Sequence, residues 1–299
     1  RRPAAERGSV LAKWAELITG AKDDLAALMT AEGGKPQREA HAEISAGAGS
    51  VEWFAAEAPR VCGDVLQPPA EGRRMLVLKQ PVGVVAAITP WNFPMSMVTR
   101  KVAPALASGC TVVLKPSEET PLTALALAEL AQRAGVPPGV LNVVMGDAPA
   151  IGEELLTAPA VAKLSFTGST RVGKALAAKC AATVKRVSLE LGGNAPFVVF
   201  EDADVDQAAD GIVASAFRNS GQTCICANRV LAHEGVHSEL VRALAARVGA
   251  LRPGDGVAPD TTQGPLISPE AVRKVEDHVQ DAVARGASVA VGGGRVLQE

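Results

Sequence analysis

The 299-residue sequence contains no tyrosine, and only 3 % of its residues are aromatic. A core poor in rings must rest on Ala, Val and Leu, and the hydrophobic share of 47 % is ordinary for globular domains. The length suggests roughly two domains, since single cores seldom grow past about 250–300 residues. The 30 basic and 32 acidic residues nearly cancel, which excludes the strongly basic surface of a nucleic-acid-binding protein.

Long apolar runs are also missing. The longest, residues 82–88, is far shorter than the roughly 20 residues that a transmembrane helix needs. The five cysteines are an odd number and widely spread, so they do not resemble a disulfide framework, and the four histidines form no Cys/His zinc pattern. We therefore predict a cytoplasmic protein without membrane contact and without a metal centre.

Apolar periodicity predicts helices over residues 5–31 and 37–57. From residue 75 short β-rich runs alternate with helical stretches, with strands expected at residues 82–88, 111–114, 141–144, 163–166 and 186–189 and helices at 97–107, 121–134, 151–157 and 170–181. Strands that alternate with helices predict a parallel sheet with crossover helices, which is a doubly wound α/β domain. Thr120 can cap the helix that follows it, with Pro121 in the first turn.

A second set of elements follows the glycine pair at residues 192–193. We expect strands at 196–200 and 229–233 and helices at 204–217, 238–250 and 269–286, the last of them capped by Ser268. The domain boundary is placed near residue 191. The predicted domains are an N-terminal helical and dinucleotide-binding domain, 1–191, and a partial α/β catalytic domain, 192–299.

The G-x-G-x-x-G fingerprint of common dinucleotide-binding domains is missing. Three other segments could bind phosphate or ribose. In residues 114–118, at a strand end, Lys115 can donate to ribose hydroxyls and Glu118 can accept from a diol. Residues 166–170 run from a strand into a helix start, which favours a pyrophosphate, and a glycine pair, Gly146 and Gly152, opens another helix. Each segment also fits an ordinary turn or helix cap.

Cys224 is the cysteine best placed to react, because it lies in a polar loop, residues 217–226, just past a helix. Cys110 and Cys180 lie among apolar neighbours and are interpreted as small core residues. No histidine is close in sequence to act as a base. The Cys-x-Cys pair with Cys226 fits a redox pair or merely two small residues, so the loop alone leaves the function open.

Two further residues are candidates for catalysis. Glu190 lies at the end of an apolar strand, beside glycines, where a general base could stand. Asn92 lies between two prolines with aromatic neighbours, and its rigid amide could stabilise an oxyanion. The alternatives are a surface or capping carboxylate and a hydrogen-bonded turn asparagine.

Taken in order, these segments resemble the aldehyde dehydrogenase superfamily, and the resemblance runs essentially from end to end. Within this superfamily, the sequence is most similar to the succinate-semialdehyde dehydrogenase branch. The residues that carry the resemblance are Pro90–Pro94, Lys115–Glu118, Phe166–Ser169, Leu189–Gly193 and Gly221–Cys224.

The resemblance implies a role for each candidate. Cys224 would attack the aldehyde carbon, Asn92 would hold the oxyanion, and Glu190 would activate the water that hydrolyses the thioester. Arg100 and Arg218 would bind a distal carboxylate of the aldehyde substrate. The cofactor contacts would come from Trp91, Lys115, Ser117, Glu118, Gly146, Gly168, Ser169 and Leu191.

Glu118 would repel a 2′-phosphate, so NAD is expected over NADP, although NADP stays possible. The resemblance also implies a homo-oligomer and relatives that extend beyond both ends of the chain, so that the 299-residue piece alone would be unstable or inactive. It further suggests that Cys226 could form a reversible disulfide that switches activity off. The alternatives are a non-catalytic cofactor-binding fragment and a dehydrogenase for glutarate semialdehyde or another aldehyde.

Overall fold

The computed structural model describes residues 2–296, and the chain divides into two compact units. The first unit contains the chain up to Glu32 together with His41–Leu191. The second contains Gly33–Ala40 and everything from Gly192 onward. The short segment 33–40 therefore packs with the C-terminal part of the chain rather than with its neighbours in sequence.

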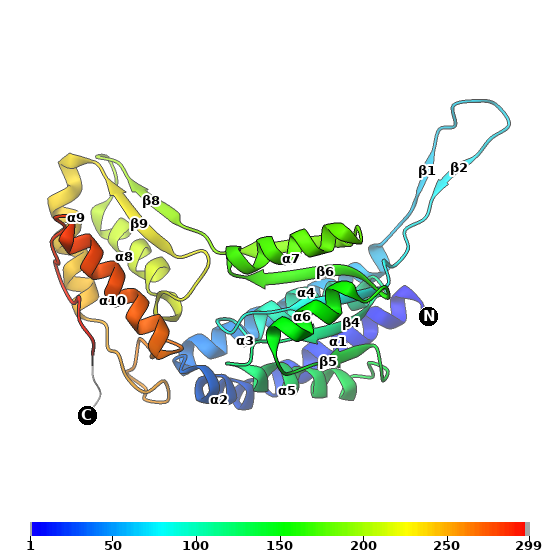
Figure 1. The fold of residues 1–299 in the computed structure, drawn as a ribbon, viewed down its shortest axis with the longest axis horizontal. Helices are drawn as coiled ribbons and strands as arrows, with labels where there is room; N and C mark the ends of the chain where they lie inside the picture. Colours follow the sequence, from blue (N-terminus) through cyan, green and yellow to red (C-terminus); the bar gives the residue numbers. More distant parts are fainter. Residues whose placement is uncertain (1, 297–299) are drawn as a thin grey trace. The chain divides into compact units, whose positions relative to one another are not determined.

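The first unit is built on a five-stranded parallel sheet with strand order β5-β4-β3-β6-β7 (Figure 1). The chain starts in the middle at β3, moves outward through β4 and β5, and returns to the other side of β3 with β6 and β7. This order confirms the predicted doubly wound α/β fold. The strands are β3 (Val84–Ile88), β4 (Thr111–Lys115), β5 (Leu141–Val143), β6 (Val161–Gly168) and β7 (Arg186–Leu191).

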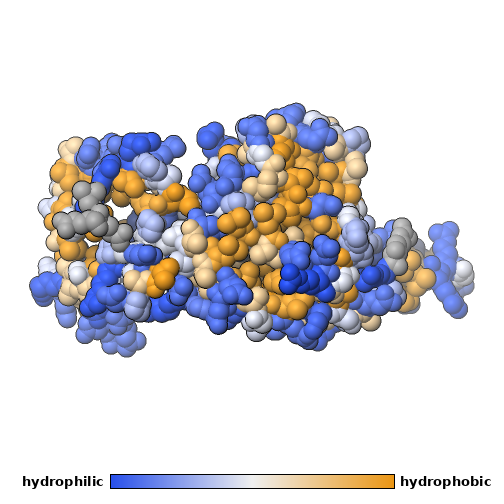
Figure 2. All heavy atoms as spheres, turned by 90° about the horizontal axis from the view of Figure 1, so that it is seen from below, coloured by the Kyte–Doolittle hydropathy of each residue, from blue (hydrophilic) through white to orange (hydrophobic). Residues whose placement is uncertain are grey.

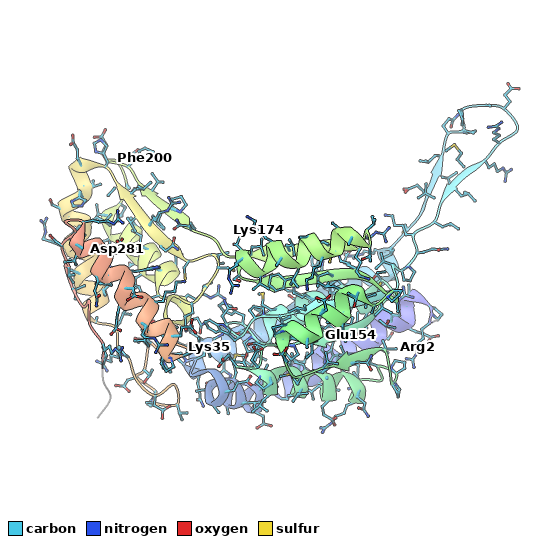
Figure 3. The ribbon with its side chains drawn as sticks, in the orientation of Figure 1. Arg2, Lys35, Glu154, Lys174, Phe200 and Asp281 are labelled. Atoms are coloured by element: carbon cyan, nitrogen blue, oxygen red, sulfur yellow. The ribbon has the colours of Figure 1, made fainter. Side chains whose placement is uncertain are left out.

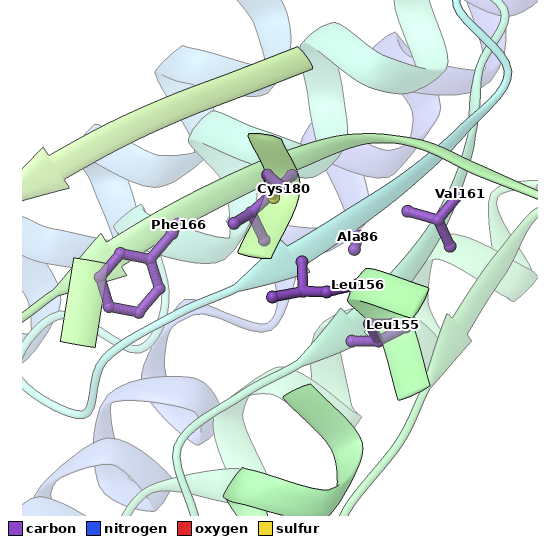
Figure 4. Close-up of a cluster of buried hydrophobic side chains, with 7 residues drawn as sticks. Ala86, Leu155, Leu156, Val161, Phe166 and Cys180 are labelled. Atoms are coloured by element: carbon purple, nitrogen blue, oxygen red, sulfur yellow. The ribbon is translucent and has the colours of Figure 1, made fainter. Parts of the chain in front are cut away.

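Helices cover both faces of this sheet. Helices α4 (Ser96–Ala107) and α5 (Pro121–Arg133) pack with α1 (Ala4–Gly20) on one face, and α6 (Ala148–Thr157) and α7 (Thr170–Ala182) pack on the other. Between the sheet and α6 and α7 lies a buried cluster (Figure 4) whose members are Ala86, Leu155, Leu156, Val161, Leu164, Phe166 and Cys180. Without tyrosine, this core depends on aliphatic side chains and a single phenylalanine.

The helix predicted over residues 5–31 is wrong in one respect, because the structure contains two helices there. Helix α1 ends at Gly20, and α2 (Lys22–Gly33) begins after one intervening residue. The N–H of Ala21 bonds back to the carbonyls of Leu17 and Ile18, which closes α1. Glycine is a poor helix former, so the interruption falls where helix propensity is lowest.

The predicted cap of α5 is also wrong. The Thr120 hydroxyl donates to the carbonyl of Trp91 at 3.2 Å and makes no capping bond to α5. Instead the carboxylate of Glu32, at the end of α2, accepts the N–H groups of Leu122 at 2.7 Å and Thr123 at 3.0 Å. A carboxylate supplied by another helix satisfies these orphan N–H groups better than a hydroxyl, because it also complements the helix dipole.

A two-stranded hairpin was not predicted. After α3 (Gln37–Glu57) and a 3-10 turn, η1 (Ala58–Arg60), strands β1 (Asp64–Leu66) and β2 (Met75–Val77) pair antiparallel. All six strand residues are exposed. Strands of three residues offer too few alternations for a period of two to be recognised.

The second unit contains a parallel pair of strands, β8 (Ala195–Val199) and β9 (Ala227–Ala232), with a small core formed by Val199, Ala209, Ile212, Val236 and Leu240. Its helices are α8 (Val205–Ala216), α9 (Glu234–Gly249) and α10 (Pro269–Ala284).

The starts of two helices in this unit can be compared with the starts predicted from the sequence. Helix α9 begins four residues before the predicted start, because the His233 imidazole caps it by accepting the N–H of Gly235 at 3.2 Å. Ser268 caps α10 as predicted, since its hydroxyl accepts the N–H of Ala271.

Several side chains on the surface of the first unit are apolar. Leu122 and Leu125 on α5 are 47 % and 44 % exposed, and Figure 2 shows a broad orange area among blue residues on the face seen from below.

No helix between residues 2 and 296 is both long and apolar enough to cross a membrane. In the same residues no group of three or more His, Cys, Asp or Glu side chains is arranged to hold a metal ion.

Candidate active site

The sheet reverses its strand order between β3 and β6. Ligands of doubly wound proteins bind in the crevice outside the carboxyl ends of the strands at such a switch point. The carboxyl end of β3 leads into the predicted oxyanion segment, residues 89–94, and β6 ends within the predicted phosphate segment, residues 166–170. The topology therefore places two of the motifs at the edge of the sheet where a ligand is expected.

The β6–α7 connection has the features of an anion site. Ser169 caps α7 with its hydroxyl, which accepts the N–H of Val172 at 3.3 Å. A Cβ on Gly168 would lie 2.5 Å from the Phe166 ring, and one on Gly173 would lie 2.4 Å from the Leu191 side chain. The glycines thus let the helix start approach the sheet closely, and its N-terminal dipole favours negative charge at this point.

The glycine pair at residues 146 and 152 does not open a helix as predicted. Gly146 precedes α6 with φ 141°, whereas Gly152 is buried inside it. The helix start is occupied by Asp147, whose carboxylate accepts the N–H of Ala150 at 2.9 Å. A carboxylate in this position competes with a phosphate, so α6 is a weaker anion site than α7.

The predicted ribose-binding segment follows β4. Lys115 is buried, and its ammonium donates to the Glu118 carboxylate at 2.5 Å. This hydrogen bond lowers the pKa of Glu118, so the carboxylate is ionised at neutral pH while 58 % of the side chain stays exposed. The nearly buried Ser117 hydroxyl accepts the N–H of Glu119.

Two buried hydroxyls support binding of a dinucleotide at this edge. The Oγ1 atoms of Thr89 and Thr167 are buried and have no hydrogen-bond partner among residues 2–296. Thr89 follows β3 directly, and Thr167 lies near the carboxyl end of the adjacent β6. Buried hydroxyls are rarely left unsatisfied. These two hydroxyls and the N–H groups at the start of α7 can donate hydrogen bonds, and the Glu118 carboxylate can accept them, so the donors and acceptors present fit a nicotinamide dinucleotide.

The predicted oxyanion donor lies in a loop that is tied to another helix. Asn92 is half-buried between β3 and α4. Glu43 on α3 is only 2 % exposed, and its Oε1 accepts the N–H groups of Met95 at 3.0 Å and Ser96 at 3.1 Å. The start of α4, four residues after Asn92, is thereby fixed to α3. Glu43 was not among the residues predicted from the sequence.

Glu190 has a charged neighbour that was not predicted from the sequence. The register pairs Glu190 on β7 with Thr167 on β6. The ammonium of Lys101, on α4, donates to the Ser165 hydroxyl of β6 at 3.3 Å. Burial lowers the pKa of Lys101 to about 8, against the attraction of the Glu190 carboxylate.

A signal for Lys101 was present in the sequence. It lies three residues after Val98 and four residues before Ala105, both of which are buried on α4. A lysine on the apolar side of a helix is rare unless its charge has a partner.

The predicted nucleophile lies in the loop between α8 and β9 of the second unit. Cys224 is exposed, whereas Cys226 is 4 % exposed and its thiol donates to the Arg218 carbonyl at 3.9 Å. Cys110 and Cys180 are buried, in agreement with their apolar neighbours, and burial raises the pKa of Cys180. All five cysteines are free thiols in this structure.

The structure distributes the predicted residues over both units. Cys224 and Arg218 belong to the second unit, where Arg218 is exposed on the 3-10 turn η2 (Arg218–Gly221). Arg100 is exposed on α4 in the first unit. The first unit also contains Asn92, Glu190 and the predicted cofactor residues Trp91, Lys115, Ser117, Glu118, Gly146, Gly168, Ser169 and Leu191.

The sequence model of the aldehyde dehydrogenase family matches residues 1–299. The chain belongs to this family. The membership that the five motifs indicated is thereby confirmed.

Individual relatives are similar over nearly the whole chain. It is 60 % identical to a mitochondrial succinate-semialdehyde dehydrogenase of Arabidopsis thaliana over 295 residues, which are 99 % of this chain and 56 % of that enzyme. It is 54 % identical to a glutarate-semialdehyde dehydrogenase of Pseudomonas putida, covering 97 % of this chain and 60 % of that one. The crystal structure of succinate-semialdehyde dehydrogenase from Burkholderia pseudomallei superimposes with a TM-score of 0.98 at 54 % identity, covering 99 % of this chain and 61 % of that chain.

The chain thus spans a little more than half the length of these relatives. Matching family members differ in their nicotinamide cofactor. An Escherichia coli relative is named for NADP, and a matching Staphylococcus aureus structure was solved with NAD.

Proposed function

We propose that the protein is an NAD(P)-dependent aldehyde dehydrogenase of the succinate-semialdehyde dehydrogenase type. It would oxidise an aldehyde that carries a distal carboxylate to the corresponding acid. The observation that carries the proposal is the family match over residues 1–299, which includes the exposed Cys224 in its motif. The cysteines at residues 110, 180 and 226 are buried, which makes them poor candidates for the nucleophile.

The first step is addition of the Cys224 thiolate to the aldehyde carbon. A thiolate suits this chemistry because it adds readily and later leaves from a thioester. The carbonyl oxygen becomes an oxyanion that accepts hydrogen bonds from the Asn92 amide and the Cys224 backbone N–H. Loss of one such donor typically costs about 2.7–4 kcal/mol of transition-state stabilisation.

A nicotinamide cofactor held at the carboxyl edge of the sheet would supply a hydride acceptor for the substrate carbon, and Cys224 would then hold the oxidised substrate as a thioester. Glu190 then takes a proton from the water that attacks this thioester, and the acid and the free thiolate are released. The nearby Lys101 ammonium provides a positive charge for the Glu190 carboxylate. A carboxylate base in this role explains why the motif needs no histidine.

The proposed cofactor preference is NAD. The Glu118 carboxylate is exposed and is held ionised by its bond to Lys115. It can accept hydrogen bonds from both hydroxyls of the adenosine ribose, and it would repel a phosphate in the 2′ position. NADP use stays the alternative.

The proposed substrate selectivity rests on Arg100 and Arg218. Both side chains are exposed next to predicted catalytic segments. A guanidinium binds a carboxylate through two parallel charge-assisted hydrogen bonds, which selects strongly for that group. Succinate semialdehyde is the proposed substrate, and glutarate semialdehyde, one methylene longer, is the main alternative.

We also propose that the protein is a homo-oligomer, because the β1–β2 hairpin exposes a row of apolar side chains. Patches of this kind mark protein interaction surfaces. The row consists of Val65, Leu66, Met75, Leu76, Val77 and Leu78, each at least 38 % exposed. A cytoplasmic location stays a prediction, and the name of the Arabidopsis relative places that enzyme in mitochondria.

The activity is tested by following the absorbance of reduced nicotinamide with succinate semialdehyde, glutarate semialdehyde and butanal. The protein is expressed from its complete gene, together with Cys224→Ala and the control Cys62→Ala, which removes the other exposed thiol. We expect turnover in the wild type and in Cys62→Ala, and none in Cys224→Ala. Cofactor binding without turnover of any aldehyde would favour the non-catalytic alternative, and faster oxidation of glutarate semialdehyde would change the proposed substrate.

A further inference from the structure

The chain makes an unfavourable turn just before the predicted nucleophile. Asn219 (φ 52°, ψ 43°) and Ser220 (φ 55°, ψ 35°) are left-handed, and Gly221 follows with φ 78°. Glycine adopts this conformation freely, whereas residues with a Cβ do so at a cost. Such strain persists only where the surroundings hold it in place, and it gathers at functional sites.

One contact that holds the turn comes from a segment far away in sequence. The Oε2 atom of Glu39, in the first turn of α3, accepts the N–H of Asn219 at 2.9 Å. Asn219 is 5 % exposed, so water has little access to replace this bond. The segment 33–40 that contains Glu39 belongs to the second unit, the same unit as the turn.

The opposite side of the turn is held by the loop that precedes α10. The Ser220 hydroxyl donates to the carbonyl of Gly264 at 2.8 Å, and the Gln222 side-chain oxygen accepts the N–H of Ile267 at 2.9 Å. A Cβ on Gly264 would lie 2.0 Å from the carbonyl oxygen of Gly34. The loop and the segment 33–40 are therefore packed directly together, and both form hydrogen bonds with residues of the turn or next to it.

The two residues that precede Cys224 are folded back onto the same turn. The Gln222 amide donates to the Asn219 carbonyl at 3.1 Å, and the Thr223 hydroxyl donates to the Arg218 carbonyl at 3.1 Å. The conformation of the turn thus determines where the Cys224 thiol and its backbone N–H lie. Both groups take part in the proposed chemistry, as nucleophile and as oxyanion donor.

We propose that Glu39 is a positioning residue for Cys224, acting through its hydrogen bond to Asn219. This inference rests on the proposed aldehyde dehydrogenase activity. The carboxylate does not touch the substrate; it keeps the left-handed turn in place, and the turn aligns the thiol and the N–H of Cys224. A small misplacement of reacting groups costs a large factor in rate, because their orientation is no longer fixed in advance.

The test compares two substitutions at Glu39. Glu39→Gln keeps an oxygen that can accept the Asn219 N–H, whereas Glu39→Ala removes the acceptor. Glu52→Ala is the matched control, because it removes an exposed carboxylate from the same helix. All variants are made in the protein expressed from its complete gene.

Two readouts are measured: amide hydrogen exchange of the peptide that contains residues 219–224, and kcat and KM with succinate semialdehyde and NAD. For Glu39→Ala we expect exchange to be at least ten-fold faster and kcat at least ten-fold lower, with the KM for NAD unchanged. Glu39→Gln should stay within about three-fold of the wild type in both, and Glu52→Ala should not differ from it. A general loss of structure would instead change the KM for NAD and exchange throughout the chain.

Several outcomes would overturn the inference. A kcat of Glu39→Ala within two-fold of the wild type would show that the turn holds without this bond. Equal losses in Glu39→Gln and Glu39→Ala would show that the negative charge matters rather than the hydrogen bond. If the wild type oxidises none of the aldehydes, the proposed function fails, and the exchange data alone decide whether Glu39 holds the turn.

Discussion

Replacing the buried Lys101 by methionine is expected to make the first unit more stable at neutral pH. Lys101 is 9 % exposed, and its burial holds the pKa at about 8 instead of 10.5. The folded protein therefore loses the lysine proton at about pH 8, whereas the unfolded chain keeps the charged form up to higher pH. At pH 7 the lysine is charged in both states, so folding bears the full cost of burying that charge.

The size of this cost follows from the pKa difference. A shift of 2.5 units, from 10.5 to about 8, corresponds to roughly 3 kcal/mol at about 1.36 kcal/mol per unit. Methionine removes the cost but also removes the bond to Ser165, which contributes about 1 kcal/mol. The expected net gain in the free energy of unfolding at pH 7 is about 2 kcal/mol.

The pH dependence has a definite sign. Between pH 8 and pH 10.5 the unfolded lysine binds a proton that the folded one has lost, so wild-type stability rises with pH across this window. The advantage of Lys101→Met should be complete below pH 8 and should shrink steadily above it.

Urea unfolding followed by tryptophan fluorescence measures this effect, because all three tryptophans, Trp14, Trp53 and Trp91, lie in the first unit. The control is Lys174→Met on α7, where the side chain is exposed (Figure 3) and the change should stay within about 0.5 kcal/mol. A stability difference between Lys101→Met and the wild type that is the same at pH 7 and pH 10 would refute the reasoning. So would equal effects of the two lysine substitutions.

Substitutions at four other positions have expected outcomes. Val184→Gly should raise the melting temperature through a gain of about 1 kcal/mol, because Val184 is 88 % exposed and is held at φ 55°, a conformation that glycine adopts freely. Glu43→Ala should lower the free energy of unfolding in urea by about 3 kcal/mol, because it leaves two buried N–H groups without an acceptor. Glu43→Gln should lower this free energy by less than half as much, because both N–H groups bond to one oxygen, which the amide keeps. Glu118→Ser should shift the ratio of kcat/KM values towards NADP, and an unchanged ratio would argue against its role at the ribose. Arg218→Ala should raise the KM for succinate semialdehyde far more than the KM for butanal, and equal effects would remove Arg218 from carboxylate binding.

Much of the fold could be predicted because its signals are local. The alternation of strands and helices between residues 82 and 189 predicts the parallel sheet, and the capping residue Ser268 marks the start of α10. Local signals were misleading where a distant residue competed for the same role. Thr120 has the right type and position for a cap, but Glu32 takes the N–H groups of α5 and leaves the threonine hydroxyl to bond Trp91.

The residues of the candidate site also divide into those that could be predicted from the sequence and those that could not. Its motif residues, such as Cys224 and Glu190, could be found because they lie in short contiguous segments. Lys101, Glu39 and Glu43 were not predicted, because each forms its hydrogen bonds with a partner in another part of the chain. Between Glu39 and Asn219 the separation is 180 residues, and nothing in the spacing of either segment indicates the other.

The sequence by itself determined the family and the α/β class and supplied the candidate reactive residues, since contiguous motifs and apolar periodicity are properties of the chain before it folds. Only the tertiary structure decided which charged side chains are buried and which loops are fixed by hydrogen bonds from distant residues. Strand register pairs Glu190 with Thr167 beside the buried Lys101, and packing of the segment 33–40 brings Glu39 to the strained turn. The physical reason is that burial and hydrogen bonding depend on contacts between segments that are distant in the sequence and come together only when the chain folds. The lowered pKa of Lys101 and the left-handed conformation of Asn219 both depend on such contacts.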